Sequence, residues 1–555
     1  MLLWIQLPLF LLGLGFFAYR RLLRYLQFFQ QEEYHGRRFL AWLWRTRAFD
    51  SRATIACAAA LMFAAFCPGA ISSFVYLAAG VLFAAVGLIE RDPRREGKLR
   101  LKMTDRARRI YKLAFAFAGA ALLAAIVLDY CLPGGRPLWR VWLLLAVAIQ
   151  AMPLSVVFSN VCLLPAEKRR QEQFVAEARA ILSHTRPTVI GITGSYGKTS
   201  TKTLLNEMLG IVEPTFTLGR SINTLMGITR EIRERMKLGH RYAVIEMGAY
   251  QRGSITTLCA LTPPQAGIIT AVGVMHLERF GSPENVFLAK SELAEAIPPE
   301  GILVCNGDDE GARRIAQQHP KRLTLLYGFD QSRPLDCRMT DIAAMDGGTT
   351  FVVHWRGRQY PGSTPLCGRP MLSNIMAAFT MACALGHDPR VMLAVVASME
   401  PVENRLQVKR LTVPRPALAP DDAAAGKVNI VELRDAYNSN PVGFAAALEE
   451  LGRVKGKRKI LVTPGMVELG SRQSAENEAI AARAASVCQM AIIVGTTNEQ
   501  ALRAGLRKGG LTEQQIRSFR TRDEAFQFLR RSHEEEDVVL IENDLPDLYE
   551  ATARF

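Results

Sequence analysis

Cysteine is scarce in this chain: the 555 residues contain ten, and no two of them form a Cys-x-x-Cys pair. A disulfide framework needs a much higher density of cysteine, and structural zinc sites need cysteines paired at short spacing. The sequence therefore excludes both as the basis of the fold. We expect reduced thiols and a catalytic part that faces the cytosol.

Excess charge is nearly absent from the last two thirds of the chain. The formal net charge is +16, but residues 1–185 alone hold 24 Lys and Arg against 11 Asp and Glu. A nucleic-acid-binding domain would carry its basic excess on its own surface. The charge distribution therefore argues against a nucleic-acid partner, although the overall balance is basic.

Neither disorder nor a wholly membrane-embedded chain fits the composition. Hydrophobic residues make up 49% and charged residues 22% of the sequence, which is typical of folded domains. The mean hydropathy of +0.09 is too low for a chain that lies entirely in a bilayer. At about 150 residues per domain, the length predicts three or four domains.

Long apolar runs occur only in the first third. A helix needs about 20 residues to cross a bilayer. Residues 1–164 therefore predict a transmembrane domain of about five spans, although three or four remain open if one run lies at the interface. The first run lacks a basic start and a small-residue cleavage site, so it is not a cleavable signal peptide. The five runs are Leu2–Tyr19, Ala53–Phe66, Ile71–Ile89, Leu113–Leu128 and Val141–Leu164, with a turn at Cys67–Gly69.

Lysine and arginine set the predicted orientation of these spans. The connection at residues 90–112 carries ten of them against four acids, and Lys168–Arg170 follow the last run. The positive-inside rule then places the N-terminus outside and everything after Leu164 in the cytoplasm. Gln150 and Asn160 lie inside the last run, where polar packing between helices is favoured over a path for lipid headgroups.

From Pro187 onward, apolar strands alternate with helices, which is typical of α/β domains. Leu323–Leu366 has the pattern of a small antiparallel patch, and the Pro/Ala-rich Val413–Gly426 is predicted as a surface loop near a domain junction. We expect a linker helix at 165–186, a central domain at 187–407 and a doubly wound C-terminal domain at 408–555. The expected buried strands are Thr188–Thr193, Tyr242–Glu246, Ala266–Ala271, Ile302–Asn306, Val428–Glu432, Lys459–Val462, Ala491–Val494 and Asp537–Ile541.

A glycine-rich turn between the first of these strands and the next helix is the strongest local signal. It reads Thr-Gly-Ser-Tyr-Gly-Lys-Thr-Ser and ends at Ser200. Backbone N–H groups at a helix start, a lysine and a hydroxyl next to it suit a phosphate and its Mg²⁺ ion. The strict GxxxxGK[ST] spacing fails because residue 192 is isoleucine. The predicted phosphate contacts are Gly194, Ser195, Gly197, Lys198, Thr199 and Ser200.

This loop resembles that of the Mur ligase family, and eight further segments follow in the family's order. The resemblance extends from about residue 187 to 490 and is strongest to the MurF branch, which adds a D-alanyl-D-alanine dipeptide. It implies a P-loop central domain and a Rossmann-like C-terminal domain. The segments are Asn223–Gly227, Val244–Ala249, His276–Gly281, Ala289–Glu292, Asn306–Asp309, Asn374–Ala378, Asp435–Pro441 and Met466–Gly470.

The family resemblance implies an ATP-dependent acid–amino-acid ligase, which activates a carboxylate as an acyl phosphate for attack by an amine. Lys198 would contact the β- and γ-phosphates. Thr199 and Glu246 would hold one Mg²⁺ ion. His276 and Lys290, the latter carbamylated by CO₂, would hold a second. Lys198, His276 and Lys290 are thus the expected catalytic residues.

The resemblance also assigns the rest of the nucleotide site. It places Asn306, Tyr437 and Asn438 near the adenine, Arg405 near the phosphates and Asp435 at the ribose. Here Arg405 follows an asparagine, whereas the family has a glycine before the arginine.

Three departures from the family leave the substrates open. The apolar first third stands where MurF has a domain for the uridine nucleotide. The family's Gly-Asp-Met reads Pro464–Met466 here, and the last strand runs into the acidic Glu542–Asp547 instead of a basic segment. The acceptor is therefore expected to be muropeptide-like, linked either to UDP or to a lipid, and the amine to come from an amino acid or a dipeptide.

We therefore expect a multi-pass ligase of the bacterial inner membrane, with cytoplasmic catalytic domains, that acts in peptidoglycan precursor synthesis. Two enzymatic alternatives are a ligase similar to poly-γ-glutamate synthases and a P-loop ATPase coupled to membrane transport. A pseudoenzyme scaffold is disfavoured because Lys198, Glu246 and Lys290 are all present.

Overall fold

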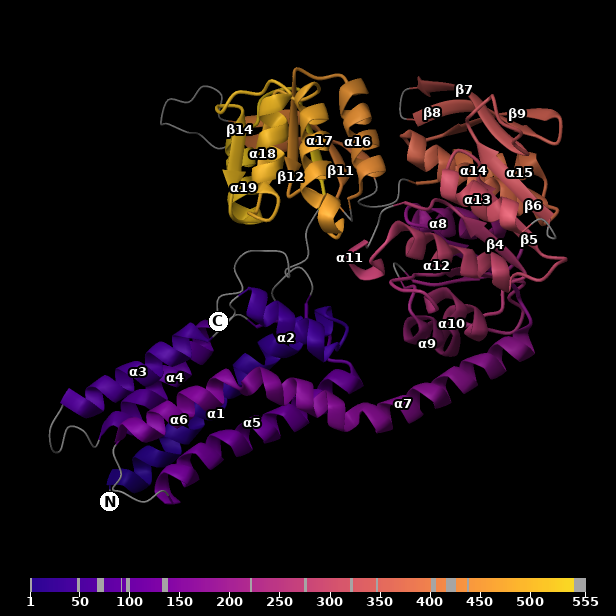
Figure 1. Ribbon diagram of the computed structural model, residues 1–555. Helices are drawn as coiled ribbons and strands as arrows, with labels where there is room; N and C mark the ends of the chain where they lie inside the picture. The colour runs from indigo at the N-terminus through magenta and orange to yellow at the C-terminus, as the bar shows by residue number, and fades with distance from the viewer. Residues whose placement is uncertain are drawn as a thin grey trace. The chain divides into compact units, whose positions relative to one another are not determined.

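The computed structural model divides the described residues into two compact units, one within 2–170 and one within 171–543. Each unit is described by itself (Figure 1). The structure describes residues 2–46, 50–66, 74–90, 92–95, 100–131, 138–219, 222–273, 277–319, 323–345, 348–400, 406–415, 426–436 and 439–543.

Helices make up the described part of the first unit. Aromatic and aliphatic side chains such as Phe10, Phe83 and Trp142 form its core. α1 approaches α4 so closely that a Cβ atom on Gly13 would lie 2.1 Å from the carbonyl oxygen of Gly80. Small residues allow such contact between apolar helices. The helices are α1 (Leu2–Gln31), α2 (Gly36–Arg45), α3 (Ser51–Phe66), α4 (Val75–Ile89), α5 (Asp105–Cys131), α6 (Leu138–Gln150) and the first half of α7 (Met152–Thr185).

One described helix, Asp105–Leu128, is long and apolar enough to cross a membrane, and a second span results if the bent pair α6–α7 counts as one. The predicted span Val141–Leu164 corresponds to the bent pair α6–α7, which is broken after Gln150 with a bend of 49°. Pro153 explains the break, because it has no N–H and its ring excludes the carbonyl of residue 149. The predicted turn at Cys67–Gly69 lies outside the described residues.

Polar side chains in the first unit join its helices. Gln150 donates to the carbonyl of Asp50 at 3.1 Å and to the Thr54 hydroxyl at 2.7 Å. Asn160 accepts a hydrogen bond from Arg106 at 3.0 Å. The prediction that Gln150 and Asn160 serve polar packing between helices is therefore confirmed.

A buried ion cluster ties three of these helices together. The guanidinium of Arg21 on α1 lies 2.8 Å from Asp50 before α3 and 2.9 Å from Glu90 after α4. All three residues are buried. Charges in such surroundings persist only when paired.

The second unit starts with a nine-stranded sheet, in the order β2-β3-β1-β4-β5-β6-β7-β8-β9. Strands β2 to β7 run parallel and β7 to β9 form antiparallel hairpins, which confirms the predicted antiparallel patch (Figure 1). The strands are β1 (Thr188–Thr193), β2 (Thr215–Thr217), β3 (Tyr242–Glu246), β4 (Ala266–Ile269), β5 (Ile302–Asn306), β6 (Leu323–Gly328), β7 (Cys337–Met345), β8 (Gly348–Trp355) and β9 (Arg358–Thr364).

Helices cover both faces of this sheet, as expected when parallel strands are joined by helices. Residues of α8, α14 and α15 share one hydrophobic core with the strands, and residues of α10, α12 and α13 share another. The helices are α8 (Lys198–Gly210), α9 (Leu225–Arg235), α10 (Ser254–Leu261), α11 (Leu277–Phe280), α12 (Pro283–Ala296), α13 (Glu310–Gln318), α14 (Arg369–Ala384) and α15 (Pro389–Ala397).

A six-stranded sheet follows, in the order β10-β11-β15-β12-β13-β14. Only β10 runs antiparallel. The elements are β10 (Gln407–Arg415), β11 (Gly426–Asp435), α16 (Pro441–Arg453), β12 (Arg458–Thr463), α17 (Gln473–Ala485), β13 (Met490–Val494), α18 (Glu499–Lys508), β14 (Ile516–Phe519), α19 (Arg522–Ser532) and β15 (Asp537–Glu542).

The predicted surface loop Val413–Gly426 was wrong at both ends. Val413 to Arg415 complete β10, and Gly426 begins β11, to which β10 is paired. The proline at 414 hid this strand from the sequence pattern, yet an edge strand tolerates a residue without an N–H group. Residues 416–425 lie outside the described part.

Candidate functional site

The glycine-rich loop leaves the middle of the nine-stranded sheet. It joins β1, which lies between β3 and β4, to α8. Gly197 begins the helix with φ of +80°, and a Cβ atom there would lie 2.3 Å from Oδ1 of Asn374. A Cβ atom on Gly194 would lie 2.0 Å from the hydroxyl of Thr270. Both positions therefore require glycine, which leaves backbone N–H groups open to an anion.

We predict that Gly197→Ala lowers the melting temperature and weakens ATP binding. The left-handed backbone costs about 1–2 kcal/mol for an alanine, and the contact with Asn374 adds to that cost. Thermal unfolding and titration with a non-hydrolysable ATP analogue measure the two effects. Gly239→Ala is the matched control, because Gly239 has φ of +97° with nothing within 4 Å. Equal losses in the two variants would contradict a special role for the loop.

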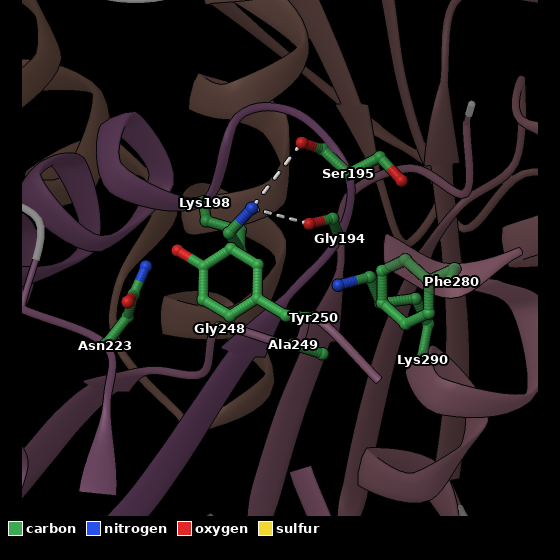
Figure 2. A pocket seen from close by; sticks show the side chains of 9 residues that line it. All are labelled: Gly194, Ser195, Lys198, Asn223, Gly248, Ala249, Tyr250, Phe280 and Lys290. Atoms are coloured by element: carbon green, nitrogen blue, oxygen red, sulfur yellow. Dashed lines mark hydrogen bonds between the residues drawn. The ribbon is translucent and has the colours of Figure 1, made fainter. Parts of the chain in front are cut away.

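Lys198 curls back over this loop. Its amine donates to the carbonyl of Gly194 at 2.7 Å and approaches that of Ser195 at 3.5 Å (Figure 2). The Ser195 hydroxyl donates to the carbonyl of Gly273 at 2.9 Å and so fixes the loop. The lysine charge thus lies where loop N–H groups and the start of α8 already favour an anion.

Glu246, the last residue of β3, connects three parts of the site. Its Oε1 accepts hydrogen bonds from the Thr199 hydroxyl at 3.1 Å and the Asn223 amide at 3.2 Å. Its Oε2 has no hydrogen bond to any described residue and lies 3.3 Å from the amine of Lys202. Glu246 is only 1% exposed. A hydroxyl and a carboxylate next to a phosphate loop are hard oxygen ligands, so they fit a Mg²⁺ ion.

Lys290 lies on α12 and is 3% exposed. Burial, reinforced by the charge of Lys198, holds the pKa of the Lys290 amine well below its usual range. Glu292 fixes this helix, because its carboxylate accepts the N–H groups of Gly253 at 2.6 Å and Thr256 at 2.9 Å at the start of α10. Lys290 therefore presents an amine with an increased neutral fraction to the site.

These residues surround one small pocket. Figure 2 shows the amine nitrogens of Lys198 and Lys290 both pointing into it. The rings of Tyr250 and Phe280 close it, and Asn223 lies on the side toward Glu246. Its lining residues are Gly194, Ser195, Lys198, Asn223, Gly248, Ala249, Tyr250, Phe280 and Lys290.

A larger cavity of about 600 Å³ lies beside the start of α8, and Asn306 and Asp435 line it together with Tyr196, Gly197 and Ser200. The Asn306 amide donates to the carbonyl of Thr270 at 3.0 Å. The volume of this cavity is in the range of nucleotide and drug-sized ligand sites.

The structure thus brings together the six predicted loop residues, Glu246 and Lys290, and places Asn306 and Asp435 on the neighbouring cavity. Among the described residues, no group of three or more His, Cys, Asp and Glu could hold a metal ion. Four predicted site residues, His276, Arg405, Tyr437 and Asn438, lie outside the described residues.

Sequence reasoning missed Lys202 and Tyr250. Lys202 follows Thr199 by three residues, so both side chains lie on the same side of α8. A lysine among the buried positions of that helix was the available signal, since it requires a partner. Tyr250 follows the predicted segment Val244–Ala249 directly and had no signal of its own.

At the acidic end of the last strand, β15, the side chains of Glu542 and Asn543 are buried. Glu542 is fully buried, and the Ser439 hydroxyl donates to it at 2.6 Å. Burial and the neighbouring charge of Asp435 raise the pKa of the Glu542 carboxyl well above its usual range. The adjacent Asn543 donates to the carbonyl of Gly465 at 2.6 Å. These groups link the ends of β11 and β15 to the loop after β12.

The phosphate loop lies between the central parallel strand β1 and α8, and Glu246 at the end of β3 lies beside its Thr199. This arrangement defines a P-loop nucleotide-binding protein. Family models agree and are more specific. Residues 192–382 match the Mur ligase middle domain, and residues 424–542 match the Mur ligase, glutamate ligase domain. Together they match more than half of the residues, and the chain belongs to the Mur ligase family.

Curated relatives are UDP-N-acetylmuramoyl-tripeptide–D-alanyl-D-alanine ligases. The protein of Bacillus subtilis is 29% identical over 294 residues, which cover 53% of this chain and 59% of the relative. That of Escherichia coli is 28% identical over 296 residues, covering 52% and 60%. The chain thus spans about three fifths of these relatives' length.

Solved structures show the same fold. MurF from Acinetobacter baumannii aligns with a TM-score of 0.57 at 24% identity, over 67% of this chain and 76% of that one. MurF from Thermotoga maritima in complex with ADP aligns with a TM-score of 0.56 at 24% identity, over 67% and 80%. At this identity the likeness concerns the fold alone.

Proposed function

We propose that this protein is a membrane-anchored, ATP-dependent ligase of peptidoglycan precursor synthesis. It joins a muropeptide-like carboxylate to the amine of an amino acid or dipeptide. The observation that carries this proposal is the single pocket in which the phosphate loop, its lysine and the buried Lys290 converge, with Asn223 leading to Glu246. The names of the curated relatives support the same reaction class.

In the proposed reaction, the acceptor carboxylate attacks the γ-phosphorus of ATP, ADP leaves, and an acyl phosphate forms. The amine then attacks the acyl carbon, the C–O bond to the phosphate breaks, the phosphate leaves with the bonding electrons, and the proton lost from the nitrogen passes to the released phosphate or to water. Lys198 and the loop N–H groups offset the charge on the phosphates. Thr199 and Glu246 would hold a Mg²⁺ ion, which would supply further charge neutralisation. The protein's main task is to position the reactants and to exclude water.

Lys290 has the properties that carbamylation requires. A neutral amine reacts with CO₂ to form a carbamate and releases a proton. This reaction turns a nitrogen base into an anionic oxygen ligand. Burial beside Lys198 favours the neutral amine, and the carbamate would gain from that same cation. We assign the carbamylated Lys290, with His276, to a second Mg²⁺ site.

For the nucleotide, we assign Asn306, Tyr437 and Asn438 to the adenine, Asp435 to the ribose and Arg405 to the phosphates. Asn306 and Asp435 support this assignment because both line the cavity that begins at Gly197.

The first unit is the proposed anchor, with about five membrane spans in residues 1–164, the last of them broken at α6–α7. Among the residues that the structure describes, 32 large hydrophobic side chains are exposed, and 23 of them lie in residues 1–164. A soluble surface seldom exposes so much apolar area, whereas lipid covers it without cost. We place the protein in the bacterial inner membrane, with 165–186 as linker helix and with the domains 187–407 and 408–555 in the cytoplasm.

The test is phosphate release by the detergent-purified protein with ATP and Mg²⁺. Acceptors are UDP-MurNAc-tripeptide, its lipid-linked counterpart and oligo-glutamate; amines are D-alanyl-D-alanine and single amino acids. We expect release that needs one acceptor and one amine together, with a product lighter than their sum by one water in mass spectrometry. Release without either substrate would contradict the ligase proposal, and growth of a glutamate polymer would favour a different ligase.

A further inference from the structure

Lys202 is a buried cation that the proposed reaction does not use. It lies on the second turn of α8, is 3% exposed, and donates to the carbonyl of Gly219 at 2.9 Å. The same amine lies 3.3 Å from Oε2 of Glu246. The lysine thus contacts both the metal-binding carboxylate and the loop that leads to Asn223.

The two oxygens of Glu246 have different surroundings. Oε1 faces the hydroxyl of Thr199 and the amide of Asn223, where the Mg²⁺ ion is proposed. Oε2 has no hydrogen bond within the described residues and forms its ion pair with the amine of Lys202 at 3.3 Å. Lys202 therefore offsets the charge of the carboxylate at Oε2, while Oε1 stays available for a divalent ion.

A buried carboxylate without a counter-charge is costly, so some cation must accompany Glu246 in the free enzyme. Lys202 supplies it without leaving the protein interior. The same charge repels a divalent ion that approaches Oε1 from a few ångströms away, and such repulsion is strong where water is excluded. Phosphate oxygens on the loop would offset this repulsion.

Resting on the proposed metal site, we infer that Lys202 is the internal counter-ion of Glu246 and keeps the affinity for a free divalent ion low. The ion then binds well only together with the phosphates of the nucleotide. Lys202 is a positioning residue in this arrangement, because it acts through Glu246 and does not touch the substrate.

The experiment measures Mn²⁺ binding to the full-length protein in detergent by electron paramagnetic resonance, without turnover. The neutral variant Lys202→Gln can still donate to Gly219, and Lys202→Met is a second neutral variant in case the first does not fold. Without nucleotide, we expect Mn²⁺ to bind the neutral variant at least about tenfold more tightly than the wild type. Lys202→Arg keeps the charge and should bind as weakly as the wild type. With a non-hydrolysable ATP analogue, the difference should shrink.

Two outcomes separate the possible failures. Mn²⁺ affinity in Lys202→Gln that equals or falls below that of the wild type would overturn the counter-ion inference and leave the ligase proposal intact. A tenfold gain that persists in the double variant Lys202→Gln/Glu246→Gln would show that Glu246 does not hold the ion, and so would overturn the metal assignment itself. Loss of the gain in the double variant supports both.

Discussion

Replacing Lys198 by methionine is expected to reduce ATP-dependent ligation by a factor on the order of 10³ or more, with the protein still folded and membrane-bound. The Lys198 amine lies over the loop, within 2.7 Å of the Gly194 carbonyl, and is partly buried. Its loss removes the lysine charge of the loop from the place where phosphate charge must be offset. The methionine keeps most of the apolar stem, so packing changes little.

Phosphate release with the acceptor and amine that the substrate screen identifies measures this effect, and thermal unfolding checks the fold. Lys237→Met is the matched control, because Lys237 is an exposed lysine of the same unit and its loss changes the net charge equally. If Lys198→Met turned over ATP at the wild-type rate, the loop would not be the phosphate site. A similar loss in Lys237→Met would instead point to net charge.

Strands buried on both faces were the easiest elements to predict. Thr188–Thr193, Tyr242–Glu246 and Ile302–Asn306 have the predicted bounds in the structure, because a short apolar run flanked by turn residues has few other stable arrangements. Strand β10 was not predicted, since its sequence mixes charged residues with a proline. Its pairing with β11 is a long-range contact that no local pattern encodes.

The site shows the same division. The loop around Lys198 could be read from the sequence because its glycines, lysine and hydroxyls are neighbours in the chain. Glu246 and Lys290 needed the family resemblance, since residues 198, 246 and 290 meet only through the strand order. Lys202 could not be assigned to Glu246 from the sequence, because its place among the buried positions of α8 indicates only that it needs a partner. The 3.3 Å contact identifies Glu246 as that partner.

Lys290→Met should give the second large loss, again on the order of 10³-fold in ligation, but with a gain in stability. The pKa of Lys290 is held well below its usual 10.5. In CO₂-free buffer, between the lowered pKa and pH 10.5, the unfolded chain therefore binds a proton at this residue that the folded chain does not. Stability of the wild type falls as pH drops from 10.5 toward the lowered pKa, and methionine removes this dependence.

The variant should therefore melt at a higher temperature than the wild type near neutral pH, and the difference should vanish above pH 10.5. Turnover of the wild type should rise with added bicarbonate and fall as acid restores the ammonium form, which cannot react with CO₂.

Glu295→Gln, on the exposed side of the same helix, controls for changes to α12. An inactive Lys290→Met protein that is also less stable at every pH would mean that the lysine supports the fold and not the chemistry. Full activity would remove Lys290 from the site. Inactivity combined with higher stability is what a residue kept for function at the expense of folding must show, because burial next to the Lys198 cation disfavours the ammonium form of Lys290 and so costs folding free energy.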